Sequence, residues 1–154
     1  MAAVGPHADG VDDFLEVTGI APPLPVNDWV AWVIISPNQD LTGWYMATTA
    51  GLPPGLNVRR LSAFDQVRVT IGGTAANDVT DVGATPVGTA VSLLVTRDSV
   101  VGSRAYIDGM EFLSDADPTD NAAGDALQIF MNGLTGWIGG TVHDVGFHDG
   151  VLTG

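Results

Sequence analysis

The chain has 154 residues and no cysteine, so its fold and function depend on neither disulfides nor thiol chemistry. Eighteen acidic residues, five arginines and no lysine give a net charge of −13, which argues against nucleic acid as a partner because phosphates need a basic surface. Only 15% of the residues are charged, against about 25% in ordinary soluble domains, so neutral loops and burial against other copies of the chain both stay open as explanations.

The first half of the chain predicts short strands, because apolar runs alternate with turns of glycine and proline. Residues 29–35 form a continuous apolar run, and we expect there a central strand covered on both faces. In residues 66–71 the apolar Val67, Val69 and Ile71 alternate with polar residues and therefore share one face. The strands expected in this half are 14–17, 29–35, 44–49, 56–61 and 66–71.

The second half continues this pattern. Residues 72–86 are loop-like with room for one short strand, and residues 114–124 form an acidic loop. Asp108 and Gly109 predict a tight hairpin turn, because both residue types tolerate positive φ angles. The strands expected here are 90–97, 104–107, 110–113, 127–131 and 141–147. The chain therefore predicts about ten strands, no helix and a single domain over residues 1–154.

Several short motifs follow one another in a characteristic order. Residues 9–14 read Asp-Gly-Val-Asp-Asp-Phe, Trp32 lies inside the next long strand, residues 106–109 read Tyr-Ile-Asp-Gly, and residues 140–145 read Gly-Thr-Val-His-Asp-Val. In this order and spacing the chain resembles laminin G-like domains of the concanavalin A-like jelly-roll group. The resemblance implies an all-β fold, an antiparallel two-sheet jelly-roll sandwich with negligible helix. It also implies neighbouring first and last strands, with Phe14 and Leu15 beside Val145 and Phe147.

Calcium is the cofactor that the resemblance makes possible, because many laminin G-like domains carry it at the rim. Calcium takes six to eight oxygen ligands, often from aspartate. If the first and last strands pair, the acids that would converge are Asp9, Asp12, Asp13 and Asp144. Side-chain turns and solvated carboxylates are the simpler explanation of these residues. A weaker second group of acids comprises Asp115, Asp117, Asp120 and Asp125, which also suit a solvated loop.

No catalytic motif is present, and we expect the protein not to be an enzyme. A glycoside hydrolase needs two carboxyl groups about 5 to 9 Å apart, whereas Glu16 and Glu111 stand alone in the sequence. No Gly-x-Ser-x-Gly motif accompanies His7, His143 or His148. The two later histidines are expected to be surface residues rather than zinc ligands.

Sugar binding would need exposed aromatic faces beside polar groups. Trp44, Tyr45 and Trp137 flank glycine-containing loops and are the candidates, although burial in the core is the alternative for each of them. Trp29 and Trp32 lie in the apolar central run and are expected in the core.

Two functions remain open. The first is a structural protein of a virus particle, on the virion surface as a capsid decoration or tail component, assembled as a homo-oligomer such as a trimer on a capsid or tail protein. It is favoured by the low charge density, by an initial Met and by the lack of a secretory signal, although a piece of a longer chain would fit as well. The alternative is an extracellular, lectin-like module that binds host glycans. No apolar stretch is long enough to suggest membrane insertion.

Overall fold

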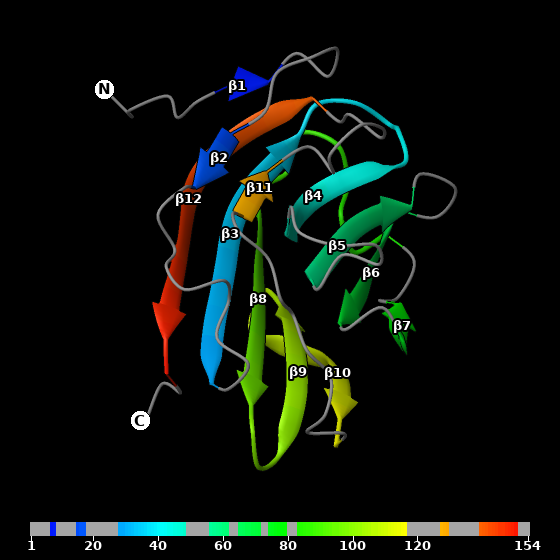
Figure 1. Ribbon diagram of the computed structural model, residues 1–154. Coiled ribbons are helices and arrows are strands. Elements are labelled where there is room, and N and C mark those ends of the chain that lie inside the picture. Colours follow the sequence, from blue (N-terminus) through cyan, green and yellow to red (C-terminus); the bar gives the residue numbers. More distant parts are fainter. Residues whose placement is uncertain are drawn as a thin grey trace.

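All regular structure in the described part of the chain is β-strand, as expected (Figure 1). The computed structural model describes residues 7–8, 15–17, 28–48, 56–61, 65–71, 74–79, 83–116, 127–129 and 139–150. Their strands form two antiparallel six-stranded sheets, here called sheet A and sheet B, whose facing sides build one core. The expectation of an all-β sandwich with two antiparallel sheets is therefore confirmed. No helix within these ranges is long and apolar enough to cross a membrane.

Sheet A contains the longest strands. In spatial order it consists of β1 (His7–Ala8), β12 (Gly140–Asp149), β3 (Trp29–Pro37), β8 (Val91–Asp98), β9 (Gly102–Ile107) and β10 (Met110–Asp115). Sheet B consists of β2 (Leu15–Val17), β11 (Leu127–Ile129), β4 (Gly43–Thr48), β5 (Leu56–Leu61), β6 (Gln66–Ile71) and β7 (Thr74–Val79). In both sheets the order departs from sequence order, so strands far apart in the chain become neighbours.

The core lies between the sheets because side chains alternate along each strand. In β8 the inward residues Val91, Leu93 and Val95 are at most 2% exposed, while the residues between them are half-buried. In β6 the alternation of Val67, Val69 and Ile71 places all three in the core, as the sequence predicts.

The central strand β3 differs from its prediction. Its inward residues, such as Trp29 and Val33, are fully buried. On the other face Val30 is 1% exposed, whereas Trp32, Ile34 and Ser36 are half-buried. The expectation of cover on both faces is therefore confirmed at Val30 but not along the rest of the strand. Within the described ranges, sheet B packs against the inward face of sheet A, which includes that of β3.

The two-residue turn after β9 is the hairpin that the sequence predicts. Asp108 has φ 48° and Gly109 has φ 80°, the left-handed conformations that such a turn requires. The Asp108 carboxylate accepts hydrogen bonds from the backbone N–H and the hydroxyl of Ser92, which join the turn to β8. The turn sets the register of β10, in which Met110 lies opposite Ile107.

The strand that contains Leu15 does not pair with the last strand, so that prediction is wrong. Leu15 lies opposite Ile129 in sheet B, whereas Val145 and Phe147 lie opposite residues of β3 in sheet A. Along one edge β12 pairs with β3 from Gly140 to Asp149, and along the other it pairs with β1 at Gly140 and Thr141. The chain before Leu15 does join the last strand, because His7 pairs with Thr141 in β1. Phe14 lies outside the described residues.

The room for one short strand that the sequence leaves in residues 72–86 is taken by the six-residue strand β7, which pairs with β6. One boundary differs. Ser114 and Asp115 lie at the end of β10 rather than in the expected acidic loop.

Candidate functional site

The outer face of sheet A, which points away from sheet B, carries a row of side chains across four strands. Val30 of β3 lies opposite Thr96 of β8, and Thr96 lies opposite Arg104 of β9. On the other side of Val30 the row continues to His148 of β12. Strand alternation directs these residues outward, because their neighbours along each strand face the core.

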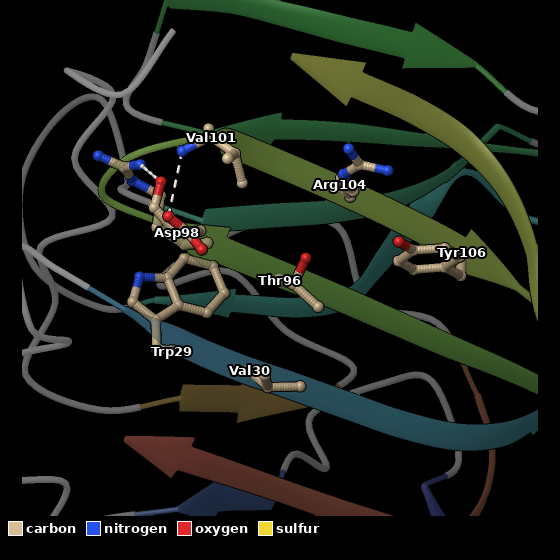
Figure 2. Close-up of a pocket in the computed structure, with 9 residues that line it drawn as sticks. Trp29, Val30, Thr96, Asp98, Val101, Arg104 and Tyr106 are labelled. Atoms are coloured by element: carbon tan, nitrogen blue, oxygen red, sulfur yellow. Dashed lines mark hydrogen bonds between the residues drawn. The ribbon is translucent and has the colours of Figure 1, made fainter. Parts of the chain in front are cut away.

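A pocket of about 290 Å³ opens over this row at the end of the sheet where β8 turns into β9 (Figure 2). Its size is at the lower end of the range of about 300–1,000 Å³ that small-molecule sites occupy. Figure 2 shows Thr96 between Val30 on one side and Arg104 on the other. The lining comes from three strands and one turn, and comprises Trp29, Val30, Thr96, Arg97, Asp98, Val101, Gly102, Arg104 and Tyr106.

One wall of the pocket carries an ion pair. A guanidinium nitrogen (NH1) of Arg104 lies 3.0 Å from Oε2 of Glu111, and both side chains are partly exposed. Hydrogen bonding to Glu111 is the main cause that raises the pKa of Arg104, with a smaller contribution from Tyr106. Arg104 therefore stays protonated, and its charge is balanced by a carboxylate on the neighbouring strand.

The opposite wall is the β8–β9 turn. Oδ1 of Asp98 accepts hydrogen bonds from the backbone N–H groups of Val100 and Val101, at 2.7 and 3.1 Å. Arg97 is 2% exposed and donates to the carbonyl of Asp98 at 2.7 Å. These contacts hold the turn in place, although the side chain of Val100 is 80% exposed.

The same turn is fixed from the outside by Asp28. Its Oδ1 accepts a hydrogen bond from the backbone N–H of Ser99 at 2.7 Å. This bond is the main reason that the pKa of Asp28 is lowered, with a smaller contribution from Arg97. Hydrogen bonds with the side chains of Asp28, Arg97 and Asp98 therefore hold the backbone that forms this wall of the pocket.

The two tryptophans of β3 have different roles. Trp29 is fully buried and stacks on Phe147 with ring centroids 6.2 Å apart, which confirms its place in the core. Trp32 lies on the outer face, where its indole N–H donates to Oδ2 of Asp144 at 3.1 Å. The expectation of a core position for Trp32 is wrong, because it follows from apolar composition and not from the alternation of the strand.

The expected sugar-binding aromatics do not form a site in the described part of the chain. Tyr45 is fully buried, so the expectation of an exposed ring there is wrong and the alternative of a core position holds. Burial raises the pKa of Tyr45 to about 12. Trp44 lies on β4, and nothing is described of its side chain. Trp137 lies outside the described residues.

The expected calcium ligands are not brought together by what the structure describes. Asp144 is exposed, and its two carboxylate oxygens accept from the Trp32 indole and from the backbone N–H of Val145. No group of three or more potential metal ligands occurs within the described ranges. The remaining acids of both proposed groups lie outside those ranges, apart from Asp115 on β10; these are Asp9, Asp12, Asp13, Asp117, Asp120 and Asp125.

The later histidines are surface residues, as expected. His143 is exposed and its Nε2 lies 2.7 Å from Oγ of Ser36 on β3. His148 is exposed as well. His7 lies on β1 and Glu16 on β2, and the structure describes only their backbone.

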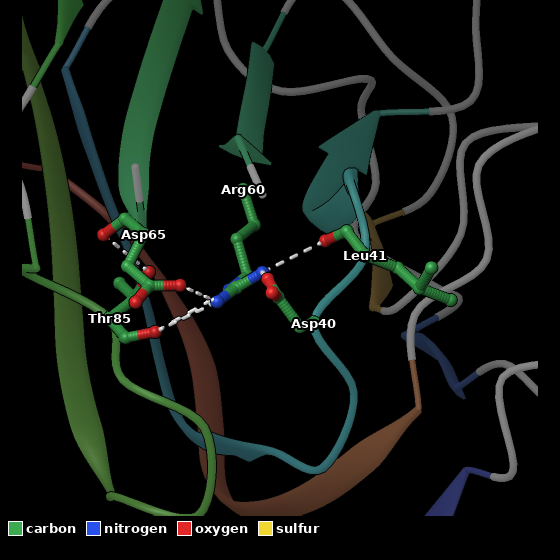
Figure 3. A network of polar contacts seen from close by, with 5 residues as sticks. All are labelled: Asp40, Leu41, Arg60, Asp65 and Thr85. Atoms are coloured by element: carbon green, nitrogen blue, oxygen red, sulfur yellow. Dashed lines mark hydrogen bonds and ion pairs between the residues drawn. The ribbon is translucent and has the colours of Figure 1, made fainter. Parts of the chain in front are cut away.

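A buried arginine lies among the loops that follow β3, β5 and β7 (Figure 3). Arg60 is fully buried, and its guanidinium pairs with Asp65 and with Asp40, the latter at 3.0 Å. It also donates to the carbonyl oxygens of Leu41 and Thr85, at 3.1 and 3.4 Å. These partners come from three separate loops, so the ion pairs and hydrogen bonds join those loops around one charge.

The preceding residue, Arg59, points the other way and is half-buried. The two arginines therefore face opposite sides of the strand, as side-chain alternation requires. A fully buried guanidinium with two carboxylates and two carbonyls around it is a structural element, because a buried charge is stable only when it is paired and hydrogen-bonded.

The comparisons with known proteins identify the fold. No protein-family model and no curated protein sequence matches the chain. A heptameric SAP-like pentraxin from Limulus polyphemus is similar in structure, with a TM-score of 0.62 and 13% identity over 91% of this chain and 76% of the pentraxin. A structure of botulinum neurotoxin type C has a TM-score of 0.65 and 14% identity over 91% of this chain, and Trypanosoma rangeli sialidase has a TM-score of 0.64 and 13% identity over 83%.

The chain covers 37% of the toxin structure and 21% of the sialidase, so it corresponds to a part of each. At these identities the likeness shows the fold alone. Together with the two antiparallel sheets, it shows that the protein is a jelly-roll sandwich of the concanavalin A-like type.

Proposed function

We propose that this protein is a non-catalytic, lectin-like binding module that recognises a carbohydrate on a receptor or cell surface. The observation that carries the proposal is the pocket on the outer face of sheet A. Apolar side chains such as Val30 and Val101 line it together with the polar Thr96, Asp98 and Arg104. Such a mixture of apolar walls and a few placed polar groups is typical of sites for small polar ligands.

Structures similar in fold support this function. The botulinum neurotoxin type C structure describes cell entry that depends on interaction with two ganglioside molecules. A sialidase is also among the similar structures, but the carboxylates at this pocket are unsuited to hydrolysis. Asp98 accepts from backbone N–H groups and Glu111 is paired with Arg104, so neither is poised as a general acid.

A panel of immobilised glycans tests the proposal, with wild-type protein and two variants. Thr96→Tyr places a bulky ring in the pocket and should abolish glycan binding. Thr70→Tyr makes the same change on an outward-facing position of β6 in sheet B and should leave binding intact. Absence of binding to every glycan, or equal binding by Thr96→Tyr, would contradict the proposed function.

A role on the surface of a virus particle remains a second candidate. It is supported by exposed apolar side chains beside the Arg60 cluster, where Leu41 is 47% and Val87 is 45% exposed. Burial of these residues against a capsid or tail protein, or in a trimer, would remove apolar surface from water. Sedimentation of the chain alone and with purified virions tests this candidate. A monomer that does not associate with virions would contradict it.

Calcium also stays a proposal. It would bind to Asp9, Asp12 and Asp13 before the first long strands, with Asp144 as the described member of the set. A rise in thermal midpoint on addition of calcium, lost in Asp144→Asn, would support it.

A further inference from the structure

Around the pocket, carboxylates outnumber guanidinium groups. Two guanidinium groups, of Arg97 and Arg104, lie at the pocket, and three carboxylates lie at or next to it, those of Asp28, Asp98 and Glu111. Arg97 is buried and donates to backbone, and Arg104 is paired with Glu111. The charge of Arg104 is therefore compensated by a carboxylate, and Arg97, which is 2% exposed, offers little of its guanidinium to a ligand.

The net charge of the whole chain also disfavours an acidic ligand. The chain carries a net charge of −13, so an approaching anion meets a repulsive field that only salt screens. An acidic ligand that binds the remaining N–H groups of Arg104 would place its own negative charge beside the carboxylate of Glu111. Such a repulsive element is a common way to reject the wrong ligand.

The pocket nevertheless offers many hydrogen-bonding groups to a neutral ligand. A guanidinium has five N–H donors, and the bond to Glu111 uses one of those of Arg104. Thr96 contributes a hydroxyl and Tyr106 a half-buried ring, while Val101, which is 53% exposed, supplies apolar surface. The groups match a ring that carries both hydroxyls and C–H faces.

We infer that this pocket selects a neutral, polyhydroxylated ligand, such as an uncharged hexose unit of a glycan, and discriminates against carboxylate-bearing sugars. The inference rests on the proposed function, because it names the chemical class of ligand for the same site. Glu111 is the specificity-determining residue, since its carboxylate lies 3.0 Å from the guanidinium that an acidic ligand would bind.

Two pairs of matched sugars provide the test: methyl glucoside with methyl glucuronide, and methyl galactoside with methyl galacturonide. Within each pair only C6 differs, as a hydroxymethyl group or a carboxylate. Titration calorimetry at low and physiological salt should give the wild-type protein about tenfold higher affinity for the neutral member of each pair. About a tenfold difference in affinity is the size of effect expected from a single modest interaction. Glu111→Gln should shift this ratio about tenfold toward the acidic member, since Arg104 is then free to bind it.

The outcomes separate the inference from the proposed function. Tighter binding of the acidic sugars by wild-type protein, or a ratio unchanged in Glu111→Gln, would overturn the inference while the glycan-binding function stands. Failure of all four sugars and of the wider glycan panel would overturn both. Thr96→Tyr, with Thr70→Tyr as its control, shows whether the measured binding takes place in the pocket.

Discussion

The indole ring of Trp32 occupies the space above Gly146, the residue directly opposite it on the neighbouring strand. A Cβ atom at residue 146 would collide with the six-membered part of the ring. Trp32 thus covers a backbone position that has no side chain of its own, and its N–H reaches Asp144 two residues before the glycine. The pairing fixes how β3 and β12 lie together on the outer face of sheet A.

Gly146→Ala should destabilise the protein by about 1–2 kcal/mol, because the added methyl group displaces the indole and weakens its bond to Asp144. Denaturant unfolding of the single variants and of the double variant with Trp32→Ala measures the effect. In the double variant the cost of Gly146→Ala should largely disappear, since the ring is absent. Additive effects of the two substitutions would show that the contact is not the cause.

Arg60→Met should lower the free energy of unfolding by about 1 to 3 kcal/mol, because the carbonyl oxygens of Leu41 and Thr85 lose a donor and the pairs with Asp40 and Asp65 are lost. Arg68→Met on the next strand is the control. Arg68 is exposed, so its substitution should change stability by less than about 0.5 kcal/mol. Equal effects of the two substitutions would contradict the structural role of the Arg60 cluster.

Tyr45 should make stability fall as the pH rises above 10. Its pKa is about 12 in the folded protein, whereas the ordinary pKa of a tyrosine is 10.0, so the unfolded chain loses this proton first and is favoured between those values. Tyr45→Phe cannot ionise and should show a smaller fall over the same range. Unfolding free energies at several pH values, compared between the two proteins, measure the difference. Identical pH profiles would refute the assignment.

Removal of residues 140–154 should give insoluble protein. The deletion takes away β12, which leaves one edge of β3 without a partner and removes Phe147 from its contact with Trp29. An open edge on a long apolar strand pairs readily with other chains. Soluble yield and sedimentation measure the outcome, with a deletion of residues 151–154 alone as the control. A soluble, equally stable product of the larger deletion would count against this view of β12.

The sequence predicted those parts of the fold that depend on residues adjacent in the chain. The Asp108–Gly109 turn and the alternation of Val67, Val69 and Ile71 follow from neighbouring residues, and the structure confirms both. The pairing of Leu15 could not be predicted in this way. It depends on the order of the strands in space, which places β2 beside β11 in sheet B and not beside β12. Strand β1 has only two residues, which are too few to show an alternation of apolar and polar side chains.

The candidate site could not be predicted for a related reason. Thr96, Arg104 and Val30 come from three strands and meet only through the register of sheet A. The sequence-based candidates for a sugar site were aromatic residues beside glycine. That pattern does not indicate exposure, and one of the residues it selected, Tyr45, is buried. One signal was present in the sequence: the hairpin turn places Tyr106 opposite Glu111, which brings Arg104 within reach of that carboxylate.

Chemical-shift mapping with a bound sugar tests the central claim most directly. Backbone amide signals are followed while a glycan that binds in the panel is titrated into labelled protein. A binding site on the outer face of sheet A predicts that shifts concentrate at residues 30, 96–98, 101–106 and 111, and that those of β5 and β6 stay unchanged. Shifts concentrated on sheet B, with none at Thr96 or Arg104, would contradict a binding site on that face.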